Sequence, residues 1–273
     1  MVIVSENFNL QQIADSGQCF RMNEIGKDRY GLVAYGRYIE LEQVDYDKIW
    51  FSCSEDEYQA IWKSYFDMDY DYNSIVQSLK NGEDEFLAKA AAYGSGIRIL
   101  RQEPFEMLIS FIISQNKNIP SIKKCIEGLC TKYGEKRISQ DCGGKEYYTF
   151  PAAEVLASAN KEDLRELKLG YRDQYVINGA KFVTEGQNDL NKLKDCSHEE
   201  AVSALRTITG VGLKVANCIS LFGLHHIEAF PVDVWIKKVL DEVYEGRFDV
   251  NLYPGYAGIV QQYMFYYIRN LNM

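Results

Sequence analysis

The sequence predicts an α+β protein: an N-terminal antiparallel β-sheet domain with flanking helices, followed by an all-helical domain. Three observations support this fold class. Residues 1–54 are rich in β-forming residues between turn signals, nearly every segment after Gln102 has apolar residues at helical spacing, and residues 205–240 place helical stretches around a Gly-Val-Gly turn. With 273 residues and 47% hydrophobic content, the chain is long enough to bury an ample core.

The strands are expected first. Residues 31–36 and 37–42 consist largely of β-formers, and Gly26-Lys27-Asp28 and Gly36 supply turn signals. An antiparallel sheet is the simplest arrangement. The string Ser-Gly-Gln-Cys-Phe-Arg at 16–21 lies at the start of this sheet, where Gly17, judged by position alone, indicates only a bulge or a turn.

From Glu55 the pattern becomes helical. The first predicted helix carries on one face Tyr58, Ile61, Trp62, Tyr65 and Phe66. A second helix is predicted from about Tyr72, with apolar positions that continue through Leu87 to Ala90. The Gly-rich break at 93–97 is the candidate domain boundary, so the expected domains are 1–96 and 97–273.

The second domain is expected to be almost entirely helical. Pro104 suits a first helical turn, and the apolar segment after it ends at the polar stretch 114–118. A further helix begins at Pro120 and closes at Gly134, and the last helix spans roughly 257–271. A polar loop between buried helices often carries function, although any two consecutive helices also need a connection.

A helix-hairpin-helix is predicted at about 198–224. Residues 197–200 form a capping-box pattern, and the helix that they open is expected to stop at Gly210. Gly210 and Gly212 permit positive φ and close backbone approach. The next helix starts near Leu213, so the free amides there point outward together and can bind a phosphate without recognising a base. A lone Gly-x-Gly turn is weak evidence, because many helix pairs need one.

Lys214 and Asp233 are the candidate catalytic residues. Lys214 lies in the first turn of a largely apolar helix, where partial desolvation and the positive end of the helix dipole favour its neutral, nucleophilic form. A lysine in such a place more commonly extends to solvent. Asp233 lies nineteen positions on (233 − 214), where it can cap a helix from Val234 to Tyr244 and stay ionised. A plain cap is the alternative for Asp233 alone, but the conjunction of hairpin, Lys and Pro-Val-Asp is a strong signal.

Composition and charge exclude several classes. The net charge of −9 and the pI of about 5.0 count against a broad nucleic-acid-binding surface, although a base-flipping enzyme needs only a small local patch with backbone donors. Seven cysteines without a Cys-x-x-Cys pair argue against a disulfide framework and suggest a reducing compartment. The three histidines lack metal-ligand spacing, and neither a signal peptide nor a membrane span is expected.

The hairpin with Lys-Val-Ala-Asn-Cys at 214–218 and Pro-Val-Asp-Val at 231–234 resembles the 8-oxoguanine DNA glycosylases of the helix-hairpin-helix superfamily. The Ser-Gly-Gln-x-Phe-Arg match at 16–21 extends the resemblance, which covers the chain from Gly17 to Phe265. It implies a bifunctional glycosylase/lyase in which Lys214 attacks the sugar and Asp233 stabilises its cationic character. Related enzymes with an iron–sulfur cluster hold it with four cysteines after the catalytic Asp, and no cysteine follows Cys218, so no cluster, metal or other cofactor is expected.

The resemblance also implies the contacts with DNA. The carbonyl of Gly17 and the amide of Gln261 would bind the extruded base, whose faces Cys218 and Phe265 would sandwich. Asn116 would enter the space left by the base, and Tyr171-Arg172 would form a wedge beside the opposite base. The expected base-binding residues are Gly17, Cys218, Pro231, Gln261 and Phe265, and the expected DNA-binding residues are Asn116, Ser121, Tyr171, Arg172, Gly210, Gly212 and Val215.

Two departures from the family pattern bear on function. Trp235 stands where many relatives have a His two residues after the catalytic Asp, so what that His does for the Asp and the phosphate must differ here. Ser121 stands where eukaryotic relatives place an Arg that recognises the partner cytosine, so a relaxed opposite-base preference is expected.

The predicted protein is therefore a monomeric, cytoplasmic, prokaryotic enzyme that excises 8-oxoguanine from double-stranded DNA. The first alternative is the same superfamily acting on another damaged base, such as an alkylated purine or an oxidised pyrimidine. The second alternative is a non-enzymatic helix-hairpin-helix DNA-binding protein, which would need neither Lys214 nor Asp233.

Overall fold

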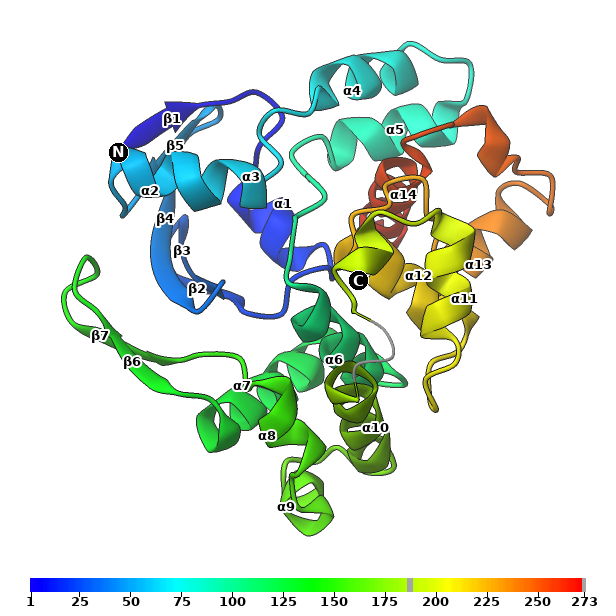
Figure 1. Cartoon of the computed structure of the whole chain (residues 1–273). Helices are drawn as coiled ribbons and strands as arrows, with labels where there is room; N and C mark the ends of the chain where they lie inside the picture. Colours follow the sequence, from blue (N-terminus) through cyan, green and yellow to red (C-terminus); the bar gives the residue numbers. More distant parts are fainter. Residues whose placement is uncertain (186–188, 272–273) are drawn as a thin grey trace.

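The computed structural model describes residues 1–185 and 189–271. The predicted α+β architecture is confirmed: an antiparallel sheet is formed by the N-terminal part, and helices make up most of the remainder (Figure 1). The strand order is β1-β5-β4-β3-β2, and each neighbouring pair is antiparallel. The strands are β1 Val2–Val4, β2 Met22–Gly26, β3 Arg29–Ala34, β4 Arg37–Asp45 and β5 Lys48–Phe51.

The tight turn between β3 and β4 is hydrogen-bonded to residues 101–103. Tyr35 and Gly36 both have positive φ, 51° and 66°, which a two-residue hairpin turn requires. A bulky residue adopts this region only where its surroundings hold it there. The amide of Tyr35 donates to Glu103 at 2.9 Å and its hydroxyl donates to the Arg101 carbonyl at 2.6 Å.

The first helical region is confirmed in position but is divided. It consists of α2 Glu55–Glu57, a π-helical turn at Tyr58–Trp62 and α3 Lys63–Tyr65, and its buried face carries the predicted Trp62, Tyr65 and Phe66. With α1 (Leu10–Asp15), it covers the inner face of the sheet around Leu32, Leu41 and Phe51.

The single helix expected from Tyr72 to Ala90 is wrong: α4 (Tyr72–Lys80) and α5 (Glu85–Tyr93) are separate helices. The chain breaks at Asn81-Gly82, and Asp84 caps α5 by accepting from the Leu87 amide at 2.9 Å. Both helices contribute their apolar faces to the core of the helical part (Ile75, Leu79, Leu87 and Ala90), not to the core under the sheet. The proposed boundary near residue 96 stays a prediction.

The helical part is built around α6 (Pro104–Ser114), which is buried from Glu106 to Ile113. The helices that follow are α7 Ile119–Tyr133, α8 Ala153–Ala157, α9 Lys161–Glu166, α10 Arg172–Thr184, a 3₁₀ turn at Lys192–Lys194, α11 His198–Leu205, α12 Leu213–Phe222, α13 Val234–Glu242, a 3₁₀ turn at Val250–Leu252 and α14 Ala257–Leu271. In the described part of the chain, none of these helices has the length and apolarity that crossing a membrane requires.

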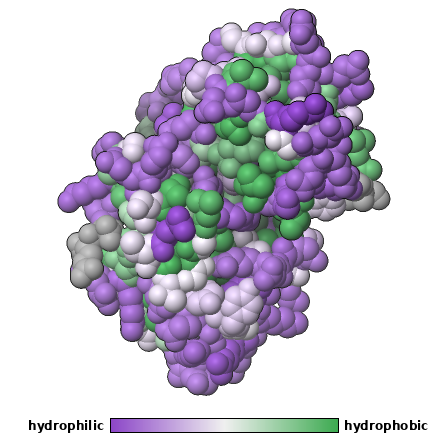
Figure 2. All heavy atoms as spheres, turned by 90° about the vertical axis from the view of Figure 1, so that its right-hand side faces the viewer, coloured by the Kyte–Doolittle hydropathy of each residue, from purple (hydrophilic) through white to green (hydrophobic). Residues whose placement is uncertain are grey.

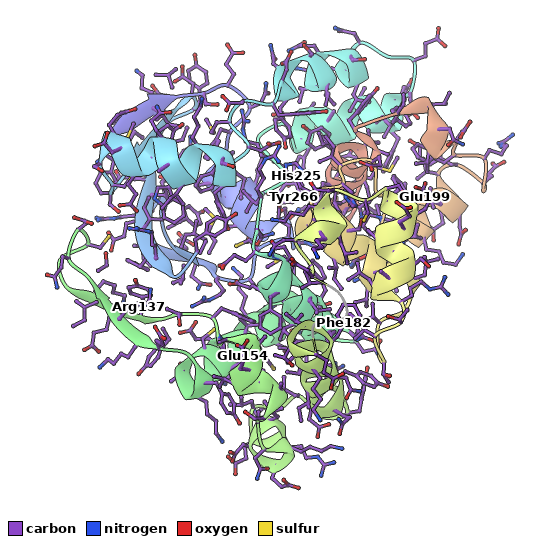
Figure 3. The ribbon with its side chains drawn as sticks, viewed as in Figure 1. Arg137, Glu154, Phe182, Glu199, His225 and Tyr266 are labelled. Atoms are coloured by element: carbon purple, nitrogen blue, oxygen red, sulfur yellow. The ribbon has the colours of Figure 1, made fainter. Side chains whose placement is uncertain are left out.

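The expectation of an almost entirely helical second part misses one hairpin, β6 (Lys136–Ser139) with β7 (Lys145–Tyr148). It projects from the helical part toward the sheet (Figure 1). Arg137, which Figure 3 labels on this hairpin, donates to the carbonyl of Gly36 at 3.1 Å, and the Tyr147 hydroxyl donates to the same oxygen at 3.1 Å. The hairpin therefore bridges the two parts of the molecule.

Candidate active site

A groove of about 1070 Å³ runs across the molecule where the sheet part meets the helices. Its walls come from the end of α1, the loop between α6 and α7, the N-terminal turns of α12 and α13, and α14. A smaller hollow of about 60 Å³ adjoins it, and Gly17, Lys214, Asp233 and Phe265 line both. We call the smaller one the base hollow. Figure 2 shows the side of the molecule on which α11 and α13 lie, where apolar residues gather among polar ones.

The helix-hairpin-helix is confirmed, with two corrections to its turn. The first helix ends at Leu205, not at Gly210. Beyond it the backbone amides of Thr207, Ile208 and Val211 donate to carbonyls three residues back, so the chain forms successive turns in place of a longer α-helix. Of the two glycines, only Gly210 has positive φ, at 96°, and a Cβ on it would lie 2.3 Å from the Tyr175 ring. Gly212 is extended, exposed and has nothing within 4 Å of the place of a Cβ, so a ligand can approach its backbone closely.

Lys214 and Asp233 meet at the base hollow, as their motifs predict. Lys214 is half-buried in the first turn of α12, and its ammonium lies 5.8 Å from the centroid of the Phe111 ring. Asp233 caps α13 through one oxygen, Oδ1, which accepts from the amides of Trp235 at 3.1 Å and Ile236 at 2.9 Å. The capping bonds fix the carboxylate in place, and both side chains face the same hollow.

Cys218 lies one helical turn after Lys214 and also lines the base hollow. Burial raises the pKa of the Cys218 thiol, and the Coulombic influence of Asp233 adds to this, while the nearby Lys214 partly offsets it. The group is therefore a neutral, polarisable wall beside the amine, which suits contact with a flat ring.

Gly17 closes the other side of the hollow. Its φ is 77°, and a Cβ there would lie 3.3 Å from Phe265 and 3.4 Å from Ile119. The loop that carries it is held by the next residue, Gln18, whose buried side chain donates to the Arg98 carbonyl at 2.8 Å and accepts from the Leu100 amide at 2.9 Å. The polar Gln in this string is thus a structural clamp for the glycine before it.

Seven of the predicted residues line the base hollow together: Gly17, Lys214, Cys218, Pro231, Asp233, Gln261 and Phe265. Gln261 is buried on α14 and donates from Nε2 to the carbonyl of Pro231 at 3.0 Å. Sequence reasoning missed the next residue, Gln262, which also lines the hollow and is 3% exposed. It also missed Arg269, whose guanidinium lies 5.4 Å from the Phe265 ring centroid.

The remaining predicted residues lie farther out. Asn116, Gly212 and Val215 line the groove, and Val215 is buried, so that only its backbone can face a ligand. Ser121 is exposed in the first turn of α7, where its amide donates to Asn118 at 2.9 Å. Trp235 is half-buried and lines the groove beside Asp233.

Two loops, 115–118 and 168–172, are bonded to each other, and the first of them lines the groove; we call them the wedge loops. Asn116 has a φ of 51° and donates to the hydroxyl of Tyr171 at 3.1 Å, and Tyr171 is 51% exposed. Arg172 is buried and donates from Nε to the Gln115 carbonyl at 2.7 Å and from Nη1 to the Leu169 carbonyl at 3.0 Å. These carbonyls occupy much of its guanidinium. The expected contact of Arg172 with an opposite base stays a prediction.

Gln115 joins the wedge loops to the hairpin, and the sequence marks it only as part of the polar stretch 114–118. Its Nε2 donates to the carbonyl of Gly210 at 3.1 Å and to that of Ile112 at 3.2 Å. The turn at Gly210 and the loop that carries the exposed Asn116 are therefore held together by one side chain. In the described part of the chain, no three His, Cys, Asp or Glu side chains gather as a metal site would require, and all seven cysteines are free.

Comparison with known proteins places the chain first in a class and then in a family. The family model for HhH-GPD superfamily base excision DNA repair proteins matches residues 109–247, and the model for the 8-oxoguanine DNA glycosylase N-terminal domain matches residues 1–108. The fold and the site thus define a DNA base excision protein of the helix-hairpin-helix superfamily, and within it the chain belongs to the 8-oxoguanine DNA glycosylase family.

Relatives and solved structures agree with this assignment. An N-glycosylase/DNA lyase of Saccharomyces cerevisiae is 31% identical over 260 residues, which cover 86% of this chain and 68% of that protein. A structure of Clostridium acetobutylicum 8-oxoguanine glycosylase/lyase with double-stranded DNA is 35% identical, with a TM-score of 0.91 over 100% of this chain and 99% of that one. A structure of MBOgg1 with a low-affinity DNA ligand is 37% identical, with a TM-score of 0.92 over 100% and 96% of the two chains.

Proposed function

We propose that this protein is a bifunctional DNA glycosylase/AP lyase that extrudes 8-oxoguanine from duplex DNA, excises it and nicks the strand. The observation that carries the proposal is the meeting of Lys214, Asp233 and Cys218 at the base hollow, which adjoins a groove of about 1070 Å³. The names of the relatives, N-glycosylase/DNA lyase and 8-oxoguanine glycosylase/lyase, support the same activity.

Lys214 is the nucleophile in this proposal. Its neutral amine attacks the anomeric carbon of the sugar, the glycosidic bond breaks, and the base leaves. Asp233 faces the same hollow and stabilises the positive charge that develops on the sugar, because its capping bonds hold the carboxylate in place before the reaction begins. The C1′–ring oxygen bond then opens as the amine loses a proton, which gives the Schiff base. Loss of a proton from the adjacent C2′ carbon to water expels the 3′ phosphate by β-elimination. The steps are carried by side chains of the chain itself, and no metal or cofactor is invoked.

Extrusion of the base explains the shape of the site. The base hollow, at about 60 Å³, has room for about two water molecules and must widen to accept a purine. Phe265 is half-buried at its edge, so movement of this ring is the simplest way to open it. Asn116 and Tyr171, which are bonded to each other in the wedge loops, fill the space that the extruded base leaves in the duplex. Their contacts offset part of the few kcal/mol that flipping costs.

DNA is held by local features and not by the overall charge, which is −9. The groove is lined by four basic residues, Lys117, Lys214, Lys237 and Arg269. The exposed backbone of Gly212 lies beside them at the N-terminus of α12. A phosphate fits this arrangement because a helix N-terminus supplies donors aimed at an anion. Binding to undamaged DNA should consequently be modest and strongly salt-dependent. We further propose that the protein acts as a monomer in a prokaryotic cytoplasm.

The decisive test is borohydride trapping on DNA that contains 8-oxoguanine. Wild-type protein should become covalently linked to the DNA, and the Lys214→Gln variant should not. Lys237→Gln is the matched control, because Lys237 lines the same groove but pairs with Asp241 at 2.8 Å away from the hollow. Trapping of Lys214→Gln at the wild-type level would refute the assignment. A panel of duplexes with alkylated purines or oxidised pyrimidines separates the lesion proposed from the alternatives.

A further inference from the structure

Three residues at the base hollow form a hydrogen-bond chain with a fixed direction. The carbonyl of Pro231 accepts from Gln261 Nε2 at 3.0 Å, and Gln261 Oε1 accepts from Gln262 Nε2 at 3.0 Å. A backbone carbonyl can only accept, so it determines which end of the Gln261 amide faces it. That orientation in turn requires Gln262 to point its NH₂ group at Gln261 and its oxygen away from it.

The chain ends in an unpaired acceptor. Gln262 Oε1 is buried and has no hydrogen-bond partner among the described residues. Native proteins pair nearly all buried polar atoms, because an unpaired one loses its hydrogen bond to water without replacing it. Gln262 lines the base hollow together with Lys214 and Gly17. The oxygen is enclosed while the hollow is closed, so a base that widens the hollow as it enters can supply the missing donor.

We propose that Gln262 is a specificity-determining residue whose Oε1 accepts a hydrogen bond from the 2-amino group of the extruded purine. The inference rests on the proposed function and adds a contact to it. Gln261 Oε1 already accepts from Gln262, so the unpaired acceptor among the residues of the hollow is Gln262 Oε1. A guanine-type base carries a 2-amino donor beside its N1–H that can pair with this oxygen, and an adenine-type base lacks that 2-amino group.

The test removes the 2-amino group from the base and the side-chain amide from residue 262. Single-turnover excision is measured for 8-oxoguanine and for 8-oxohypoxanthine, which lacks only the 2-amino group, with the wild type and with Gln262→Met. The wild type should prefer 8-oxoguanine by about tenfold, and Gln262→Met should bring this ratio close to one. The ratio of the two rates cancels any general loss of activity. Gln174→Met on α10, remote from the hollow, is the control and should keep the wild-type ratio.

Two further variants keep the inference falsifiable. In a Gln261→Met background, where the bond from Gln262 Nε2 to Gln261 is already lost, Gln262→Glu retains an acceptor oxygen and should keep the preference for 8-oxoguanine; loss of the preference there would overturn the proposal. In the same background, adding Gln262→Met should lower the ratio, because the contact is direct. An unchanged ratio there would show that Gln262 acts only by orienting Gln261.

The failure of this inference differs from the failure of the proposed function. If the wild type excises neither substrate, the proposed function is wrong. If it excises 8-oxoguanine and Gln262→Met discriminates as strongly as the wild type, only the role of Gln262 is wrong.

Discussion

The base hollow adjoins the groove that the first wedge loop lines, but the hollow and the wedge loops are held by different kinds of structure. The proposed catalytic and base-binding side chains of the hollow come from helix starts and a buried helix face: Lys214 in the first turn of α12, Asp233 as the cap of α13, and Gln261 on α14. The wedge side consists of loops whose geometry depends on side chains that donate to carbonyls, such as Gln115 to Gly210 and Arg172 to Leu169.

This difference predicts which mutations should have large effects on excision and which should have small ones. In the hollow, a changed side chain alters the chemistry directly or disturbs a packed element. In the wedge loops, each hydrogen bond contributes a net ~0.5–1.5 kcal/mol, so that one bond lost changes rates by a modest factor. Mutations on the two sides should therefore separate by size of effect, and by whether they affect the chemical step or the extrusion of the base.

The largest effect is expected from Asp233→Asn. Asn caps helices as well as Asp does, so α13 should persist, but the negative charge is lost. Single-turnover excision should fall roughly 100- to 1000-fold, the usual loss when one preorganised electrostatic group is removed, while DNA binding is retained. Asp249→Asn is the matched control, since Asp249 caps the 3₁₀ turn at Val250–Leu252 away from the groove. Excision by Asp233→Asn at the wild-type rate would remove Asp233 from the mechanism.

On the hollow side, Lys214 and Asp233 were predictable from the residues, because a charge within an apolar helix and an Asp after Pro at a helix start are unusual enough to mark a site. Gly17, Gln261 and Phe265 were expected only from the family resemblance. The bonds on the wedge side were not predictable, because the partners are carbonyls, which every residue has. Gln115 lies in the polar stretch singled out, yet nothing in the sequence indicates that its side chain reaches Gly210, 95 positions away. Likewise, the buried state of Arg172 follows from tertiary packing alone.

The fold shows the same limits. The sheet and the hairpin followed from turn signals and periodicity. The β6–β7 hairpin was missed because its strands, Lys-Arg-Ile-Ser and Lys-Glu-Tyr-Tyr, are short, charged and mostly exposed, and lack the alternation that marks a strand. The break between α4 and α5 was missed because apolar residues recur at helical spacing on both sides of it, which hid the Asn81-Gly82 stop and the Asp84 cap.

A smaller loss is expected from Gly17→Ala, which tests the packed character of the hollow. Positive φ costs a residue with a Cβ ~1–2 kcal/mol, and the new methyl group would crowd Phe265. Excision of 8-oxoguanine should fall about tenfold as the loop shifts. Gly36→Ala, also at positive φ but in the β3–β4 turn, controls for backbone strain and should lower the melting temperature without this loss. Full activity of Gly17→Ala would mean that the hollow is more adaptable than its packing indicates.

Gln115→Ala should give a still smaller effect and of a different kind. Loss of its bonds to Gly210 and Ile112 frees the wedge loops from the hairpin, so extrusion should slow by about two- to tenfold. A fluorescent base analogue beside the lesion reports extrusion directly, and strand nicking at a preformed abasic site, where no base has to be extruded, should suffer less. Gln174→Ala removes a Gln on α10 that bonds Asn178 and serves as the control. Equal losses in both assays would place Gln115 in general DNA binding instead.

The last prediction concerns the partner base, on the outermost part of the wedge side. A well-placed bidentate contact gives ~1–3 kcal/mol of discrimination against a wrong base, and Ser121 is too short and uncharged to make one. The protein should therefore remove 8-oxoguanine opposite all four bases at similar rates. Ser121 is exposed, and Asn118 caps α7 by accepting from its amide at 2.9 Å, so the backbone there is fixed and an Arg side chain can extend from it without disturbing the helix. Ser121→Arg should accordingly create a preference for cytosine, measured as single-turnover excision from four duplexes that differ only in the partner base. Ser121→Gln, of similar reach but without charge, should create less. A strong cytosine preference in the unmutated protein would show that another residue already makes the contact that Ser121 cannot. The exposed side chain of Tyr171 is the first candidate for that contact.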